Sequence, residues 1–168
     1  MKKMAIALSV FIFILILTSC DPGRYHYNYD DLTQNVISIE LVEYENPKQK
    51  HFMSWVPDHS SDLVALEIEN MLILETLVEE QIDQLLLQLS EIDILYKYYA
   101  YDSPKGICIK LNHKNNDFDI LSMNIETKSS SGYIGCFTSA GSVKEFKGTF
   151  ARYEDFENLI NTYFETKI

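Results

Sequence analysis

The 168-residue sequence has little that could cross a membrane as a helix. Its N-terminal apolar run, Ala5 to Leu17, has thirteen residues and is apolar except for Ser9. A spanning helix needs about 20 apolar residues. Asp21-Pro22-Gly23 follows the run at once and ends it. We therefore do not expect this segment to be a transmembrane helix.

The short motifs of several enzyme classes are also missing. There is no Gly-x-Ser-x-Gly elbow, no Walker phosphate loop and no dinucleotide-binding fingerprint. His51 and His59 are eight residues apart, which matches neither a helical metal-binding pair nor a zinc finger. Paired carboxylates such as Asp117 and Asp119 have a structural explanation beside a turn, so no glycosidase pair can be selected. The sequence predicts no catalytic residue, no metal site and no cofactor.

Basic residues are few: 14 Lys and Arg face 25 Asp and Glu, for a formal net charge of −11. This balance argues against nucleic acid, whose phosphates need Lys and Arg for neutralisation. It also argues against adhesion of the protein surface to anionic lipid. An acidic surface attracts cations and basic peptides or proteins, although solubility alone also explains such a charge.

The N-terminus does have the layout of a secretory signal. Met1-Lys2-Lys3 is positive, the apolar run follows, and Leu17-Thr18-Ser19-Cys20 ends it with small residues. This tetrapeptide resembles the lipobox of bacterial lipoproteins. The resemblance implies that residues 1–19 are removed and that Cys20 carries diacylglycerol on its sulfur and often a third chain on its amine. Two acyl chains hold a protein stably on a bilayer, at about 0.8 kcal/mol per buried CH₂. The alternatives are an ordinary secretory signal with a chance cysteine and an uncleaved N-terminal helix.

By this resemblance the protein is attached to the cell membrane on its extracytoplasmic face, through the acyl chains of Cys20. Residues 20–35 are then interpreted as the lipidated N-terminus and a polar tether, and 36–168 as a single domain. The alternating tyrosines Tyr25, Tyr27 and Tyr29 leave open a sheet edge or an aromatic contact instead. About 130 residues are enough for one core of their own.

Periodicity predicts an α+β fold with a mainly antiparallel sheet of five or six strands. Two strands are expected at 36–44 and 67–75 and a helix at 77–90, with Thr76 and Glu79 as a capping box. One continuous helix over 62–91 is the alternative. Short connections then predict a C-terminal meander of strands at 107–112, 118–125, 133–138 and 144–150. Asn115-Asn116 fits a two-residue type I′ turn. A helix at 152–165 ends the chain.

The remaining cysteines, Cys108 and Cys136, form an even pair outside the cytoplasm, which suggests a disulfide. In the meander, however, their strands flank the strand at 118–125. That places them about 9.6 Å apart or more, at about 4.8 Å per strand, whereas a disulfide needs Cα atoms within about 7 Å. The sequence therefore predicts two buried free thiols. A Cys–His nucleophile could be drawn from either thiol with His113, but the apolar neighbours favour packing.

Aromatic residues supply the candidate binding patch. Tyr96, Tyr98, Tyr99 and Tyr101 are grouped, and Trp55 lies in an aperiodic loop at 48–61. Tyrosine has a rigid apolar face and a polar tip, and it is enriched at interfaces. The alternative is that half of these rings pack inward and the others cover a sheet edge.

Three further stretches resemble small lipoproteins of Gram-positive-type bacteria: Ile73 to Leu77, Asp102 to Ile107, and Tyr133 to Gly135. That resemblance implies no activity. The leading hypothesis is a non-enzymatic, lipid-anchored domain that binds a protein or peptide. The alternatives are a cell-envelope hydrolase, and an immunity or inhibitor lipoprotein that uses its acidic surface. A hydrolase predicts a concave pocket with converging titratable groups, a binder a flat aromatic patch, and an inhibitor a protruding acidic loop.

Overall fold

The computed structural model describes residues 23–45, 66–96 and 104–168, without the side chains of residues 129–131. Helices and strands alternate irregularly along the chain, as expected for the α+β class. In chain order the elements are β1 (Arg24–Tyr25), α2 (Tyr29–Asn35), β2 (Val36–Tyr44), the 3₁₀ turn η1 (Ile68–Asn70), β3 (Met71–Thr76), α3 (Glu79–Ser90), β4 (Ile94–Leu95), β5 (Gly106–His113), β6 (Phe118–Asn124), β7 (Ser129–Phe137), β8 (Val143–Phe150) and α4 (Tyr153–Tyr163).

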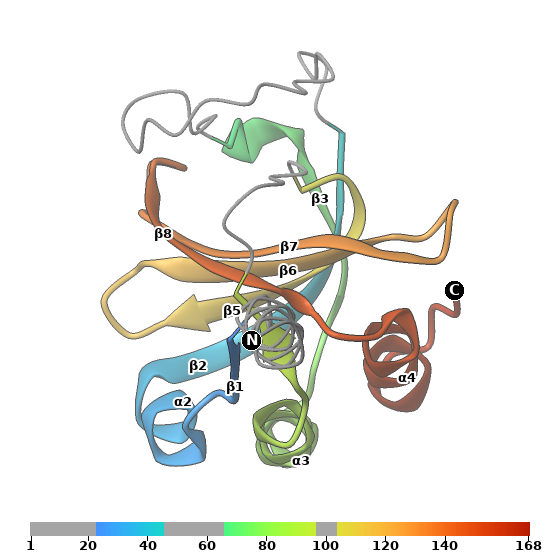
Figure 1. Ribbon diagram of the computed structural model, residues 1–168. Coiled ribbons are helices and arrows are strands. Elements are labelled where there is room, and N and C mark those ends of the chain that lie inside the picture. Colours follow the sequence, from blue (N-terminus) through green and yellow to red (C-terminus); the bar gives the residue numbers. More distant parts are fainter. Residues whose placement is uncertain (1–22, 46–65, 97–103) are drawn as a thin grey trace, which may run out of the picture.

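All described strands belong to one sheet with the order β1-β4-β8-β7-β6-β5-β2-β3 (Figure 1). Every neighbouring pair is antiparallel. The α+β class and the C-terminal meander, β5 to β8, are confirmed. The predicted number of five or six strands was too low, because the prediction did not include β1 and β4, which have only two residues each. Such short strands leave no periodic pattern in a sequence.

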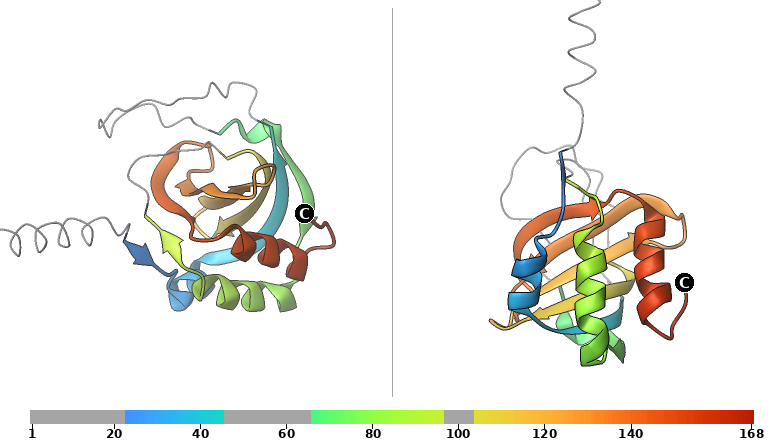
Figure 2. Two further views of the ribbon diagram at one scale, coloured as in Figure 1. Left: turned by 45° about the vertical axis from the view of Figure 1, so that its right-hand side comes forward. Right: turned by 90° about the horizontal axis from the view of Figure 1, so that it is seen from below.

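The three α-helices of the described residues lie side by side across one face of the sheet (Figure 2). They enclose the larger hydrophobic cluster, in which α3 contributes Leu85, Leu86 and Leu89 and α4 contributes Phe156 and Leu159. Strand residues that alternate with those of this cluster form a second, smaller one around Phe118, Tyr133 and Phe137. The two clusters therefore use both sets of alternating side chains of the central strands.

The tether predicted at 20–35 is wrong for its described part, residues 23–35. β1 pairs with β4 at the edge of the sheet, and α2 packs on the core through the buried Leu32. The Asn28 side chain accepts a hydrogen bond from the Asp31 N–H and so caps α2. Asn28 and Leu32 therefore help to hold this segment in the domain, and the segment is too short to show helical periodicity.

The strand and helix predicted around residue 76 are confirmed with different boundaries, and a single helix over 62–91 is wrong. Thr76 is not the N-cap of α3, because it still pairs with Glu40 in the sheet. The helix begins at Glu79, and Val78 before it makes no side-chain capping bond. The terminal helix is α4, slightly shorter than the 152–165 expected.

The turn between β5 and β6 also differs from the prediction. A type I′ turn needs positive φ at both central residues, but here only Asn116 has it, at 66°. The loop runs from Lys114 to Asp117, and the Asn115 side chain accepts from and donates to Asp117. Local side-chain bonding therefore favours a longer loop over the two-residue turn.

The two described cysteines are free and buried, as predicted. β5 and β7 flank β6, and Cys108 and Cys136 belong to those outer strands. They also differ in surroundings, since Cys108 lies in the smaller hydrophobic cluster and Cys136 does not. Within the three described ranges, no helix combines the length and apolar character that a membrane crossing requires.

Candidate functional site

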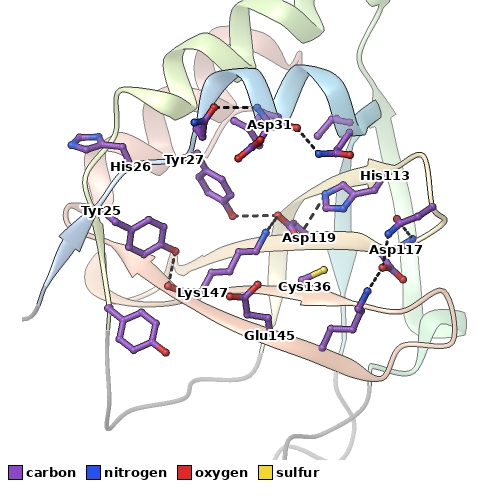
Figure 3. A pocket seen from close by; sticks show the side chains of 17 residues that line it. Tyr25, His26, Tyr27, Asp31, His113, Asp117, Asp119, Cys136, Glu145 and Lys147 are labelled. Atoms are coloured by element: carbon purple, nitrogen blue, oxygen red, sulfur yellow. Dashed lines mark hydrogen bonds and ion pairs between the residues drawn. The ribbon is translucent and has the colours of Figure 1, made fainter.

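A cleft of about 640 Å³ lies where the segment from Tyr25 to Val36 passes over the ends of β5 to β8 (Figure 3). We call it the N-terminal cleft. Its lining includes three tyrosines, Tyr25, Tyr27 and Tyr96, and a polar group formed by His113, Asp119, Cys136 and Lys147. Side chains from the start of the described chain and from strands far along it therefore enclose one space.

Two β-bulges direct lysines of β8 toward the cleft. Ile134 pairs with Gly148 and Gly135 with Phe146, so Lys147 is skipped. Farther along, Cys136 pairs with Glu145 and Phe137 with Val143, so Lys144 is skipped. A bulge breaks the alternation of a strand and re-aims a side chain. Lys144, Glu145 and Lys147 consequently all line the cleft.

Asp119 is the most buried charged group of the cleft, with 1% of its side chain exposed. Its Oδ2 lies 2.6 Å from Lys147 Nζ and accepts a hydrogen bond from the Tyr27 hydroxyl at 3.3 Å. A buried carboxylate is tolerated when it is paired in this way. Its other oxygen, Oδ1, has no hydrogen-bond partner within the described ranges.

The N-terminal tyrosines hold Lys147 in place. The Tyr25 hydroxyl donates to the Lys147 carbonyl at 2.5 Å, and Lys147 Nζ lies 5.2 Å from the centre of the Tyr27 ring. The two rings meet edge to face, 6.4 Å apart. Burial, together with the nearby Asp119 carboxylate, raises the pKa of Tyr27 well above its ordinary value. Both tyrosines therefore stay neutral near pH 7 and act as hydrogen-bond donors.

His113 and Cys136 lie on the other side of Asp119. The possible ligand atoms of these three residues are all within 4.8 Å of one another. Burial lowers the pKa of His113, although the Asp119 carboxylate opposes this shift. Burial, and next Asp119, raises the pKa of Cys136 to about 11. At neutral pH the imidazole is therefore uncharged and the thiol keeps its proton.

A second ion pair closes the rim of the cleft. Lys144 Nζ lies 2.5 Å from Asp117 Oδ2, which also accepts a hydrogen bond from Asn115. The Lys144 hydrogen bond is the main reason that the pKa of Asp117 is lowered. This pair joins the β5–β6 loop to the start of β8, so it links the β5–β6 hairpin and the β7–β8 hairpin at the rim of the cleft.

Of the predicted binding patch, only Tyr96 falls within the described residues. It lines the cleft and is 40% exposed. Trp55, Tyr98, Tyr99 and Tyr101 lie outside the described ranges, as do Cys20, His51 and His59. Of the two Cys–His combinations considered from the sequence, the structure brings His113 to Cys136, while Cys108 is buried in the other hydrophobic cluster.

Sequence reasoning missed Tyr25, Tyr27, Asp119 and Lys147 as members of one site. The tyrosines belong to the segment interpreted as a tether. Asp119 was interpreted as a residue beside a turn, and Lys147 as an ordinary strand residue. The alternating tyrosines were the one available signal, because a sheet edge or an aromatic contact was considered for them. The bulges that aim the lysines depend on pairing and leave no mark in the sequence.

The arrangement suits ligation better than nucleophilic attack. A reactive cysteine needs a lowered thiol pKa and an electropositive setting, whereas Cys136 has a raised pKa beside a carboxylate. His113, Asp119 and Cys136 instead offer three different donor atoms, which all lie within 4.8 Å of one another. The N-terminal cleft is therefore the feature from which a function can be inferred. Comparisons of the chain with protein-family models, with curated proteins and with solved structures find no match.

Proposed function

We propose that this chain is a non-enzymatic, lipid-anchored binding protein on the extracytoplasmic face of the cell membrane, and that the N-terminal cleft holds its ligand. The observation that carries the binding role is the cleft itself. Its volume of about 640 Å³ falls within the range of about 300–1,000 Å³ that is usual for ligand pockets. Aromatic faces and a few convergent polar groups line it, which is also the usual composition.

The anchor is inferred from the lipobox-like Leu17-Thr18-Ser19-Cys20. Arg24, where β1 begins, is four positions after Cys20. At most about 3.6 Å per residue, this connection spans no more than about 14 Å. A lipidated Cys20 would therefore hold the wall of the cleft beside the bilayer, so the ligand would be met at the membrane surface.

The shape of the site narrows the kind of ligand. A flat aromatic patch would suit a broad protein surface, but Tyr25, Tyr27 and Tyr96 surround a concavity. A concave site of this size suits an ion, a small molecule or the protruding end of a peptide. We therefore propose that the cleft takes a small ligand. The patch expected around Trp55, Tyr98, Tyr99 and Tyr101 stays a prediction, because these residues lie outside the described ranges.

A cell-envelope hydrolase is the second candidate function. The convergence of His113, Asp119 and Cys136 in a concave site favours it. The raised pKa of the Cys136 thiol argues against it, because the thiolate is the nucleophile in cysteine hydrolases. Binding is therefore the better-supported function.

The anchor is tested by replacing Cys20 with Ala and following the protein through membrane fractionation. The parent protein should sediment with membranes, and the Cys20→Ala variant should leave that fraction because it cannot be acylated. Cys108→Ala is the matched control, since it removes a buried thiol far from the lipobox. Equal membrane partitioning of all three proteins would contradict the anchor.

The cleft is tested by native mass spectrometry of the protein isolated from its own membranes in mild detergent. Glu145 is exposed and lines the cleft, so Glu145→Trp should fill the space without touching the core. Glu91→Trp is the matched control, because Glu91 is exposed at the end of α3. A bound mass in the parent and in Glu91→Trp, absent from Glu145→Trp, is the expected result. The same mass in all three proteins would place the ligand elsewhere.

A further inference from the structure

One oxygen of a buried carboxylate is left without a partner in the cleft. Lys147 and Tyr27 both bind Asp119 Oδ2, whereas Asp119 Oδ1 has no hydrogen-bond partner among the described residues. Leaving a buried acceptor unsatisfied costs about 1–3 kcal/mol, and more for a charged group. Native proteins satisfy nearly all such groups. The unpartnered Asp119 Oδ1 therefore indicates that a ligand binds this oxygen in the working protein.

The side chains beside Oδ1 are those of a metal-ligand set. His113 Nε2 lies 3.8 Å from Asp119 Oδ1, too far for a hydrogen bond. Cys136 completes the group, whose ligand atoms all lie within 4.8 Å of one another. The three residues come from β5, β6 and β7, and Asp119 and Cys136 are direct cross-strand partners. Adjacent strands of one sheet therefore hold the three donors in a fixed arrangement.

We propose that His113, Asp119 and Cys136 bind a divalent transition-metal ion, with Zn²⁺ as the best fit, and that the remaining coordination position opens into the N-terminal cleft. Thiolate and imidazole donors select Zn²⁺ and related metals, whereas Ca²⁺ and Mg²⁺ require oxygen ligands. Three protein ligands with an open fourth position are a usual tetrahedral zinc arrangement. This inference names a ligand for the cleft and so rests on the cleft part of the proposed function, but it does not depend on the lipid anchor.

Tyr27 and Lys147 then orient the carboxylate. By holding Oδ2, they point Oδ1 toward His113 and Cys136. Partners of this kind are a regular part of metal sites because they fix the orientation of the direct ligands. Lys147 also brings a positive charge, but the Asp119 carboxylate and the Cys136 thiolate, which forms when the metal ion displaces the thiol proton to solvent, supply two negative charges. The site as a whole therefore favours a divalent cation.

The test is a titration of the reduced, metal-stripped full chain in detergent with Co²⁺, which takes tetrahedral zinc sites and reports them by absorption. We expect one Co²⁺ per chain, a cobalt–thiolate charge-transfer band, and loss of this spectrum when Zn²⁺ is added. Cys136→Ser should lose the charge-transfer band. His113→Gln and Asp119→Asn should weaken binding by roughly tenfold or more, because even indirect partners of a metal commonly contribute that much.

Two matched controls separate the three proposed ligands from other thiols and imidazoles. Cys108→Ala removes the other described cysteine, and His26→Gln removes an exposed histidine that lines the end of the cleft away from His113, beside Asp93 (Figure 3). Both should bind Co²⁺ as the parent does. Zn²⁺ should also raise the melting temperature of the parent and of both controls, but not that of Cys136→Ser. This second readout covers the case in which Asp119→Asn does not fold.

Absence of the charge-transfer band in the parent, or its persistence in Cys136→Ser, would overturn the metal site. The first result is expected if the Cys136 thiol simply donates its proton to Asp119. If the parent binds no metal but Glu145→Trp still abolishes a bound mass, the metal site is refuted and the cleft holds a different ligand. Metal binding by a protein that does not fractionate with membranes would refute the anchor alone.

Discussion

Gly148 shows how a single residue holds the edge of the sheet together. Its φ is 140°, which side chains rarely allow, and a Cβ there would lie 2.3 Å from the carbonyl oxygen of Leu95. It lies next to the Lys147 bulge and faces β4. Only glycine permits the close approach of β4 to β8, and β4 in turn holds β1 at the wall of the cleft.

We predict that Gly148→Ala lowers the free energy of unfolding by about 2 kcal/mol or more, through both clash and backbone strain. Gly106→Ala is the matched control, because Gly106 also has positive φ, at 65°, but no atom lies within 4 Å of its Cβ position. Strain alone should cost about 1 kcal/mol there. Urea unfolding measures both values, and equal losses would contradict the close contact with Leu95.

At the scale of elements, α2 decides whether the N-terminal segment belongs to the domain. It packs on the core through Leu32, which is buried against the larger cluster. We predict that Leu32→Ala destabilises the protein by about 2–3 kcal/mol, as buried leucines commonly do. Ile37→Ala, at an exposed neighbouring position, should change stability by about 0.5 kcal/mol or less. Thermal or urea unfolding of both variants would decide, since a free tether would show no effect of Leu32→Ala.

The C-terminal segment after α4 is held by Glu75 of β3. The carboxylate of Glu75 accepts hydrogen bonds from the N–H groups of Glu165 and Thr166. Burial alone would raise the pKa of Glu75, but a hydrogen bond from the Thr166 side chain, together with these two N–H bonds, outweighs burial and holds the pKa below its ordinary value. A lowered folded-state pKa means that this stabilisation is present above the unfolded-state pKa and is lost as pH falls through the folded-state value.

We therefore predict that hydrogen exchange at the amides of Glu165 and Thr166 is slow near pH 7. After correction for the intrinsic pH dependence of exchange, these amides should become less protected as pH falls below the ordinary pKa of a glutamate. Glu75→Gln should remove most of this pH dependence, because its side chain does not titrate. Glu80→Gln, an exposed position in the first turn of α3, should leave it unchanged. Protection that is the same in Glu75→Gln and the parent across this pH range would contradict the role of the carboxylate.

At the scale of the whole molecule, the sequence predicted the class, the long strands and the meander. Val36 to Tyr44 alternates apolar and polar residues over most of its length, and α4 repeats its apolar residues at helical spacing. Pattern arguments succeed there because the burial of one face imposes the pattern. They also placed Cys108 and Cys136 on strands that flank a third, which sufficed to predict free thiols.

The site could not be predicted in the same way. It depends on pairing between Arg24–Tyr25 and Ile94–Leu95, on two bulges in β8, and on the contact of Tyr27 with Asp119. Each is a relation between distant positions, and none alters the local composition. The sequence showed that His113 and Cys136 exist, but the distance between them is set by the register of three strands.

A lipid anchor at Cys20 would also fix the orientation of the whole molecule relative to the bilayer. β1 lies at one end of the strand order and β3 at the other (Figure 1). We predict that a fluorophore on His26→Cys, in the acylated protein on vesicles, is quenched by lipids with a quencher in the headgroup. The same fluorophore on Leu72→Cys, an exposed position of β3, should be quenched less. Equal quenching at both positions would contradict an anchor close to β1.

The bond from the Tyr25 hydroxyl to the Lys147 carbonyl joins residues 122 positions apart. During synthesis one wall of the cleft is therefore made 122 positions before the residue that it binds. The Tyr25 hydroxyl lacks this partner until β8 (Val143–Phe150) has been added, whereas α4 follows later and contributes no residue to the lining. A product that stops before β8 therefore cannot enclose a ligand, so the cleft forms only after most of the chain has been made.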